Sequence, residues 1–379
     1  MKKIVLAIDS FKGCLSSKEI EQCIAEEIHR ILPSCQTVCI PIADGGEGML
    51  DTLIEATQGT FVSTQAHDPL MRIRPTRYGI LGDQRTAVIE MAEINGLTTL
   101  SPIERNPMKT STYGTGELIK DALEKGFRRF IIGIGGSATN DAGMGMMQAL
   151  GAHLYDKQGN ELEQGGKIME QIAHIDLNHL HPALKEATFI VACDVQNPFC
   201  GPQGAAYVFA RQKGASEEQI RQLDEGMRHL ALLIERDFSY NINKVKGSGA
   251  AGGLGGAFAT FLQAHLQSGI DLLLDAVDFD RKITNADWII TGEGKADRQT
   301  AEGKVPAGVL KRAKKANIPV MLIAGKVEDK ACLKQMGFAR IVQVSPDNLP
   351  LEEAMRPEVT RKNIRQAIRA LVGAFIKHR

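Results

Sequence analysis

The sequence has few of the features that mark membrane, secreted or nucleic-acid-binding proteins. No window approaches 18 consecutive apolar residues, so no membrane-spanning helix is expected. The apolar run near the start, Ile4–Ile8, is too short for the core of a secretory signal peptide. Aromatic residues make up only 5% of the chain, and 45 Lys and Arg balance 45 Asp and Glu. The composition therefore argues against a nucleic-acid partner and against a membrane partner.

The cysteines and histidines also lack the spacings that are typical of redox motifs and metal sites. The seven cysteines contain no C-x-x-C pair, and the nine histidines show no metal-ligand spacing. An odd number of cysteines without a signal peptide predicts reduced thiols and a cytoplasmic location. The sequence predicts nothing about the oligomeric state.

Glycine, by contrast, is abundant. The chain has 38 glycines in 379 residues, whereas an average usage of roughly 7% would give about 27. Nearly half of them fall in four short segments, which are Asp44–Gly48, Gly133–Gly145, Gly247–Gly256 and Gly292–Lys304. A surplus concentrated in this way indicates turns where the backbone bends tightly or approaches a ligand.

The order of expected strands and helices predicts two α/β domains. A buried strand at Lys3–Ile8 and a capping box at Ser16–Glu19 open the chain as a strand–helix unit. Near the C-terminus, buried strands alternate with helices again, at Trp288–Thr291, Pro319–Ala324 and Arg340–Val344. From about residue 60 onward, shorter strands separated by Pro and Gly are typical of a mixed sheet.

We therefore expect an α/β protein in which a Rossmann-like parallel-sheet domain is interrupted by a second α/β domain with a mixed sheet. The first domain comprises residues 1–60 and 283–379, and the inserted domain comprises residues 61–282. Ligands of open α/β sheets bind outside the carboxyl ends of the strands. We expect the active site in the cleft between the two domains.

The glycine-rich segments predict phosphate binding. A glycine-rich turn that leads into a helix presents free backbone N–H groups and the positive end of the helix dipole to an anion. The Walker A motif and the protein-kinase motifs are absent. Two dinucleotide-like patterns, Gly133–Ala138 and Gly247–Gly252, are weak, because neither has the full strand and acidic-residue context of that motif.

The glycine-rich segments also carry acidic residues. Carboxylates beside a phosphate need a cation between them, and Mg²⁺ is the ordinary one. The candidate metal ligands are Asp44, Glu47 and Glu293. Two further carboxylates, Asp9 and Asp194, each follow a buried strand and so are expected at a carboxyl end.

Six short segments occur along the chain in the order Asp9–Gly13, Ala43–Gly48, Gly135–Gly143, Ala192–Pro198, Gly249–Gly255 and Thr291–Asp297. Together they resemble the bacterial type 1 glycerate kinase family. The resemblance spans almost the whole chain. It implies a Rossmann-like domain interrupted by a second α/β domain, and ATP-dependent phosphorylation of D-glycerate. In this family the product is usually 2-phosphoglycerate; chemistry alone leaves 3-phosphoglycerate open.

Chemistry then suggests a role for each candidate residue. We expect Asp194, or else Asp9, to accept the proton of the substrate hydroxyl, and favour Asp194 because Asn197 and Pro198 indicate a stiff loop. Lys12 is expected to offset charge on the transferred phosphoryl group. The candidate nucleotide-binding residues are Gly45, Gly46, Gly135, Gly136, Ser137, Thr139, Asn140, Gly252, Gly253, Lys295 and Arg298.

Two other functions remain open on the residues alone. The dinucleotide-like patterns would suit an NAD-dependent dehydrogenase of a small hydroxy acid. The glycine-rich turns would also suit a non-catalytic module that binds a nucleotide or metabolite. The density of acidic residues near the predicted phosphate-binding turns argues against a simple binding module.

Overall fold

The computed structural model describes residues 2–11, 13–42 and 48–377. The chain divides into two compact units, Met1–Asp44 with Ile270–Arg379, and Gly45–Gly269. The units change between Asp44 and Gly45 and between Gly269 and Ile270, whereas the sequence predicted these boundaries near residues 60 and 283. Helix α2 (Met49–Thr57) belongs to the second unit, where the Leu50 backbone N–H donates to Glu90 at 2.9 Å.

The segment 270–282 belongs to the first unit because it is tied to a later helix of that unit. Arg312 lies on α11 (Val305–Lys315), and its Nη1 pairs with Asp280 at 2.7 Å. The same guanidinium also pairs with Asp271 and Asp275 of α9 (Gly269–Ala276). These long-range pairs lie outside what a local pattern can predict.

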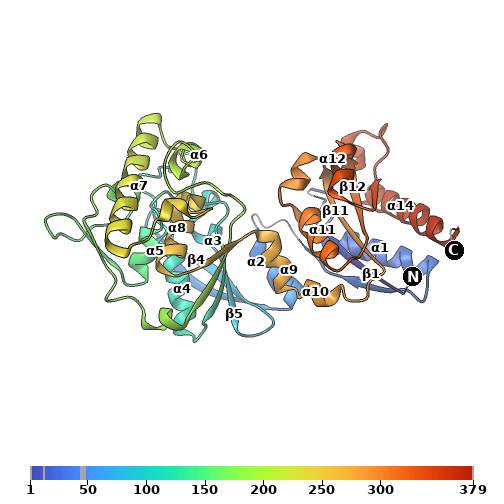
Figure 1. Ribbon diagram of the computed structural model, residues 1–379, viewed down its shortest axis with the longest axis horizontal. Coiled ribbons are helices and arrows are strands. Elements are labelled where there is room, and N and C mark those ends of the chain that lie inside the picture. The colour runs from blue at the N-terminus through green and yellow to red at the C-terminus, as the bar shows by residue number, and fades with distance from the viewer. Residues whose placement is uncertain (1, 12, 43–47, 378–379) are drawn as a thin grey trace. The chain divides into compact units, whose positions relative to one another are not determined.

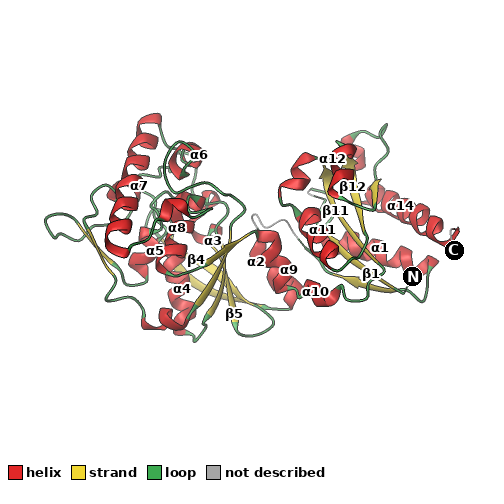
Figure 2. Cartoon of the chain, in the orientation of Figure 1, coloured by secondary structure: helices red, strands yellow, loops and turns green. Residues whose placement is uncertain are grey.

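The first unit contains a five-stranded, all-parallel sheet in the order β13-β12-β11-β1-β2 (Figures 1 and 2). The strands are β1 (Lys3–Ile8), β2 (Gln36–Cys39), β11 (Trp288–Ala296), β12 (Val320–Val327) and β13 (Arg340–Gln343). The remaining helices of this unit are α1 (Ser17–Ile31), α10 (Phe279–Lys282), α12 (Lys330–Met336), α13 (Leu351–Ala354) and α14 (Pro357–Lys377). This sheet confirms the predicted parallel-sheet domain.

Local sequence explains the start of this unit. Five of the six β1 residues are buried, as expected for a central strand covered on both faces. The Ser16 side chain accepts from the Glu19 backbone, and the Glu19 side chain accepts from the Ser16 backbone, which completes the predicted capping box. Helix α1 lies against α14, where Arg369 pairs with the buried Glu27 at 2.6 Å.

Strand β11 is longer than the sequence predicted. The fourth glycine-rich segment, expected as a loop after residue 291, begins instead as strand, because Glu293 and Lys295 pair with Ala324 and Lys326 of β12. A side chain at Gly292 would place its Cβ 2.3 Å from the Ile323 carbonyl oxygen. Glycine therefore permits close strand pairing here, where we expected a turn.

The second unit contains a six-stranded mixed sheet in the order β10-β9-β6-β5-β4-β3. Its strands are β3 (Thr60–His67), β4 (Ile73–Ile80), β5 (Thr86–Glu90), β6 (Arg129–Gly133), β9 (Thr188–Ala192) and β10 (His265–Gln267). The pairs of β4 with β3 and β5 are antiparallel and the other three are parallel. The mixed sheet that the sequence predicted for this region is confirmed.

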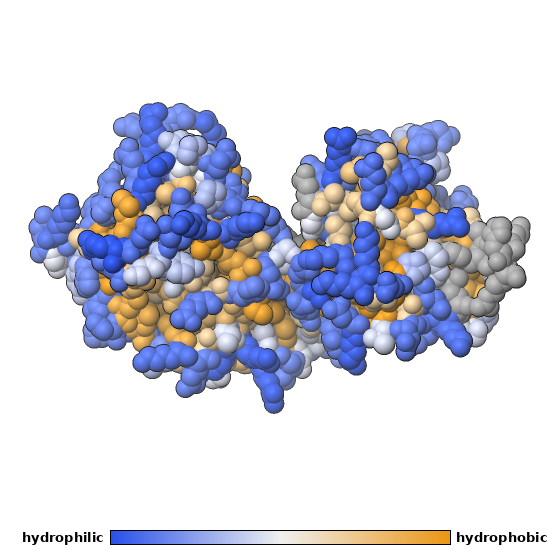
Figure 3. Space-filling model, viewed as in Figure 1, coloured by the Kyte–Doolittle hydropathy of each residue, from blue (hydrophilic) through white to orange (hydrophobic). Residues whose placement is uncertain are grey.

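The helices of the second unit, besides α2, are α3 (Ala92–Asn95), α4 (Tyr113–Glu124), α5 (Met144–Ala149), α6 (Ala205–Phe209), α7 (Glu217–Phe238) and α8 (Leu254–Phe261). A two-stranded antiparallel ribbon joins β7 (His153–Tyr155) to β8 (His174–Asp176). Hydrophilic side chains cover much of the visible face of each unit (Figure 3). Among the described residues, no helix is long and apolar enough to cross a membrane.

Candidate active site

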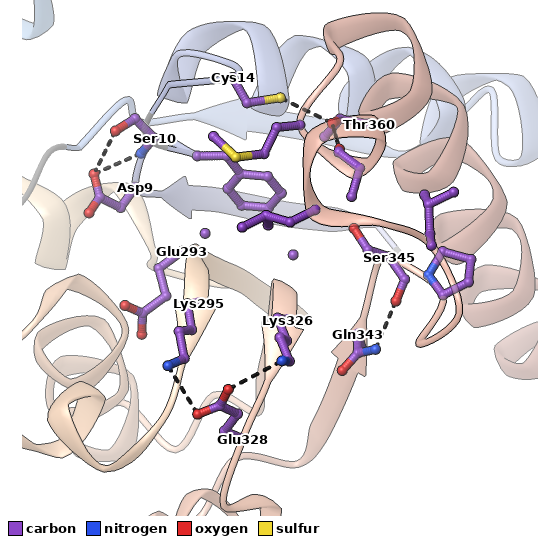
Figure 4. Close-up of a pocket in the computed structure, with 18 of the residues that line it drawn as sticks. Asp9, Ser10, Cys14, Glu293, Lys295, Lys326, Glu328, Gln343, Ser345 and Thr360 are labelled. Atoms are coloured by element: carbon purple, nitrogen blue, oxygen red, sulfur yellow. Dashed lines mark hydrogen bonds and ion pairs between the residues drawn. The ribbon is translucent and has the colours of Figure 1, made fainter.

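A pocket of about 630 Å³ lies within the first unit, at the carboxyl ends of β1, β11 and β12 (Figure 4). This is the edge at which open α/β sheets bind ligands. The charged side chains that line it are Asp9, Glu293, Lys295, Lys304, Lys326, Glu328 and Asp347. The volume is in the range that accommodates a nucleotide-sized molecule.

Two buried carboxylates, Asp9 and Glu293, line the pocket. They are 6% and 5% exposed, and the Asp9 backbone N–H donates to the carbonyl of Gly292 at 2.9 Å. Burial raises the pKa of Glu293; hydrogen bonds from Thr300 and Lys304 oppose this, and the charge of Asp9 raises it further. A cation beside the two carboxylates would lower the free-energy cost of keeping both of them charged while they are buried.

The carboxylates of Asp9 and Glu293 suit Mg²⁺ better than they suit a metal ion that takes all its ligands from the protein. The described residues contain no group of three or more His, Cys, Asp or Glu side chains that could hold a metal ion. Mg²⁺ usually takes one or two carboxylates from the protein and completes its shell with waters and substrate phosphates. Asp9 and Glu293 meet that requirement if the ligand supplies phosphate oxygens.

Three lysines of the pocket are held by carboxylates. Lys295 and Lys326 are directly paired residues of β11 and β12, and both reach Glu328, at 3.0 and 3.4 Å (Figure 4). Lys304 lies 3.3 Å from Glu293. Glu328 is 44% exposed, so an incoming phosphate can replace it as the partner of the two strand lysines.

The pocket also has an apolar side that the charged groups do not explain. It is formed by Phe11, Leu349, Leu351, Ala354 and Met355. The neighbouring Gln343 Nε2 donates to the carbonyl of Ser345 and to Asp347, both at 2.7 Å, and so fixes the chain leading to this side. A pocket with lysines and an apolar side suits a ligand with anionic and apolar ends.

The glycine-rich loop after β6 lies in the second unit. Ser137 is 7% exposed, and Thr139 and Asn140 are fully buried, whereas Gly135 is exposed and Gly136 has a φ of +70°. The Lys213 Nζ donates to the Ser137 hydroxyl at 2.7 Å and to the Thr139 carbonyl at 2.6 Å. The buried Thr139 hydroxyl has no hydrogen-bond partner among the described residues.

The glycines of the third segment pack against this loop. A Cβ at Gly252 would lie 2.2 Å from the Thr139 carbonyl oxygen, and one at Gly253 would lie 2.8 Å from the Cα of Ala142. The carbonyl of Gly252 accepts from the backbone N–H of Ala142 at 3.0 Å. Gly252 and Gly253 thus support the loop, which gives a structural reason for glycine at both positions.

Asp141 is fully buried, and its carboxylate is occupied by protein donors. It accepts from the Thr112 N–H at 2.7 Å, from the Thr112 hydroxyl at 2.9 Å, and from the N–H groups of Gly143 and Gly145 at 3.1 and 3.2 Å. Burial raises the pKa of Asp141, while these four hydrogen bonds lower it. The carboxylate ties the start of α4 to the start of α5.

Asp194, the favoured base, follows β9 and is exposed. Its Oδ1 accepts from the Gly269 N–H at the first residue of α9, at 2.9 Å. The Asn197 amide donates to the Gln203 carbonyl at 2.8 Å, and the Asn197 carbonyl accepts from the Gly249 N–H at 3.0 Å. These bonds support the stiff loop expected after Asp194.

Two groups of predicted site residues lie away from the pocket or outside what the structure describes. Arg298 is 82% exposed, pairs with Asp329 and does not line the pocket. The predicted residues that fall outside the described part of the chain are Lys12, Asp44, Gly45, Gly46 and Glu47. Their roles stay predictions.

Sequence reasoning gave no role to Lys304, Gln343 or Lys213. It placed Gly325-Lys326 at a carboxyl end, after the predicted strand Pro319–Ala324, but gave Lys326 no chemical role. Gln343 had a weaker signal, since it is positioned by the Val327 backbone N–H of the neighbouring strand, and Lys304 lies in the fourth glycine-rich segment together with its partner Glu293. Lys213 lies in a polar stretch, Arg211–Gly214, which is typical of a solvated surface, yet its side chain is 1% exposed.

The structure defines an α/β protein with a pocket of carboxylates and lysines at the strand ends of one unit and a glycine-rich loop after β6 in the other. The model of the Glycerate kinase family matches residues 4–376. The chain is 43% identical over 380 residues to "Glycerate kinase" of Bacillus subtilis (strain 168), covering 99% of this chain and 100% of that protein. The chain therefore belongs to the glycerate kinase family.

Other relatives agree with this assignment. "Glycerate 2-kinase" of Escherichia coli (strain K12) is 44% identical over 355 residues, which is 93% of each chain. A crystal structure from Salmonella typhimurium LT2, described as a glycerate kinase 2, is 42% identical and superimposes with a TM-score of 0.88. The match covers 100% of this chain and 99% of that one.

Proposed function

We propose that the protein is a glycerate kinase that transfers the γ-phosphoryl group of ATP to D-glycerate and releases ADP. Full-length similarity to proteins named glycerate kinase supports this activity. The name of the Escherichia coli relative favours 2-phosphoglycerate as the product. The observation in this chain that supports it best is the pocket in which buried carboxylates and three lysines meet.

The nucleotide and Mg²⁺ are assigned to this pocket as part of the proposal. Asp9 and Glu293 would hold the metal, which when bound neutralises phosphate charge and orients the γ-phosphoryl group. Lys295, Lys304 and Lys326 would contact phosphate oxygens. The apolar side near Leu351 and Met355 would take the purine, since it is the part of the pocket that offers a flat ligand apolar contacts.

The remaining roles concern the acceptor. Asp194 would accept the proton of the glycerate hydroxyl. Asp9, the alternative base, would take that role only if it did not hold the metal, because a carboxylate bound to Mg²⁺ is a poor proton acceptor. An anionic group of the reactants would bind the backbone of Gly135–Thr139, where Gly135 is exposed and the Ala138 N–H is already bonded to the Asn95 carbonyl. The prediction that the reaction takes place between the two units stays a prediction, as does the cytoplasmic location.

One assay tests the proposed function against the two other candidates. The protein is incubated with Mg-ATP and D-glycerate while ADP release is followed. Glycerate-dependent ADP release is the expected result. NAD reduction without ATP would instead identify a dehydrogenase, and silence in both assays would leave a binding module. Phosphorus NMR of the product then distinguishes 2-phosphoglycerate from 3-phosphoglycerate.

A further inference from the structure

Lys213 is a buried lysine that no role proposed so far uses. Its side chain is 1% exposed, and lysine is almost never fully buried unless it is paired. The partners that the described residues supply to its Nζ are the Ser137 hydroxyl and the Thr139 carbonyl, and neither is a carboxylate. A buried ammonium without a direct counter-ion is costly, so its position calls for a compensating partner.

The two hydrogen bonds of Lys213 go to one loop. Its Nζ donates to the Ser137 hydroxyl at 2.7 Å and to the Thr139 carbonyl at 2.6 Å. These two residues flank Ala138 in the glycine-rich loop that leads from β6 toward α5. An ammonium has three N–H donors, and these two bonds use two of them. The lysine therefore fixes the loop and retains one donor.

The charges around Lys213 are few. Burial lowers the pKa of Lys213 to about 7, and the charge of Asp141 raises it. Arg105, whose carbonyl packs on Gly214, directs its guanidinium to the Leu97 carbonyl at 3.3 Å. Arg211 pairs with Glu217 at the surface. Asp141 is already occupied by four hydrogen bonds, so an arriving anion would find Lys213 only partly compensated.

We propose that Lys213 is a positioning residue for an anionic group of the reactants, through the two hydrogen bonds that fix Ser137 and Thr139 and through the charge it places behind the loop. This inference rests on the proposed function. The anion is a phosphate of ATP or the carboxylate of glycerate, since both offer oxygens to backbone N–H groups. Binding of the anion favours the charged lysine, so binding takes up a proton.

The test compares the wild-type protein with Lys213→Met, which keeps an unbranched side chain, one heavy atom shorter, and removes its donors. Lys185→Met, at an exposed lysine in the turn before β9, is the matched control. We expect Lys213→Met to raise KM at least tenfold for ATP or for D-glycerate, and the ligand affected identifies the anion. Wild-type kcat/KM for that ligand should fall above pH 7, and this limb should be missing in the variant.

A second measurement separates positioning from a merely structural role. Isothermal titration of Mg-ATP and of D-glycerate, each in two buffers of different ionisation enthalpy, should show proton uptake near pH 7.5 with the wild type and none with Lys213→Met. Both KM values within twofold of wild type, an unchanged pH profile and unchanged proton uptake would overturn the proposal.

Two controls keep the outcome clear. If circular dichroism shows that Lys213→Met does not fold, Ser137→Ala takes its place as the test variant, because it retains the lysine and removes one of its acceptors. It should raise the same KM by about threefold, and no effect on any KM or on proton uptake would contradict the proposal. If the wild-type protein gives no glycerate-dependent ADP release, the proposed function fails, while proton uptake on binding still decides the role of Lys213.

Discussion

Glu293 offers the sharpest test of the proposed metal site, because its substitution separates catalysis from stability. Glu293→Gln keeps the shape of the side chain and removes its charge. The carbonyl oxygen of the new amide can still accept from the Thr300 hydroxyl, whose oxygen lies 2.6 Å from the Glu293 carboxylate. Lys304 loses its partner at 3.3 Å but is 29% exposed, so water can solvate it.

These contacts predict a small effect on stability and a large effect on rate. The substitution removes a buried charge whose pKa is raised by burial, so the free energy of unfolding should change by no more than about 1 kcal/mol. Loss of a group that stabilises transition-state charge typically lowers kcat by roughly 10²–10³-fold, or about 2.7–4 kcal/mol. The Mg²⁺ concentration for half-maximal rate should rise as well.

The assay follows glycerate-dependent ADP release at several Mg²⁺ concentrations, and urea unfolding measures stability. Glu26→Gln is the control, since Glu26 is a 54% exposed carboxylate of the same unit that pairs with Arg365. Burial raises the pKa of Glu293, so protons compete with Mg²⁺ for this carboxylate as the pH falls, and apparent Mg²⁺ affinity should decrease toward acidic pH in the wild type and less so in Glu293→Gln. A kcat within threefold of wild type would refute the assigned role.

Three further predictions concern other parts of the chain. Asp194→Asn should lower kcat at least a hundredfold with little change in KM for ATP; near-normal kcat would exclude Asp194 as the base. Asp68 is fully buried and pairs with Arg72 and Arg74 at 2.6 and 3.0 Å, so Asp68→Ala should lower the free energy of unfolding by about 2–3 kcal/mol, and urea unfolding showing no change would contradict this. The pKa of Lys213 is lowered to about 7 in the folded state, so above that pH the unfolded chain binds more protons than the folded protein. The contribution of this group to the free energy of unfolding should therefore rise by on the order of 2 kcal/mol between pH 7 and 9. The same pH dependence of the unfolding free energy in wild type and Lys213→Met, measured by urea unfolding, would refute this.

Much of the fold could be predicted because it depends on local patterns. The apolar run Lys3–Ile8 formed a buried strand, and the capping box at Ser16–Glu19 started a helix, as short-range hydrogen bonds require. The alternation of strands and helices at the two ends of the chain predicted the parallel sheet, and the shorter strands after residue 60 predicted the mixed one.

The site was only partly predictable. The positions of Asp9 and Glu293 at strand ends followed from the rule that ligands bind at the carboxyl edge of parallel strands. Their place in one pocket depended on β1 and β11 being neighbours in the sheet, which the strand patterns alone could not establish. Lys326 faces the same pocket because β12 pairs with β11 beyond the predicted strand ends.

The sequence by itself determined the fold class, the glycine-rich loop and the family resemblance, because each depends on short segments whose residues are close together along the chain. Only the tertiary structure decided which charged groups share a pocket, and which lysine is buried. Lys213 shows the reason most clearly. Its neighbours Ser137 and Thr139 lie more than seventy residues away along the chain, and no local pattern records a contact made by folding across that distance.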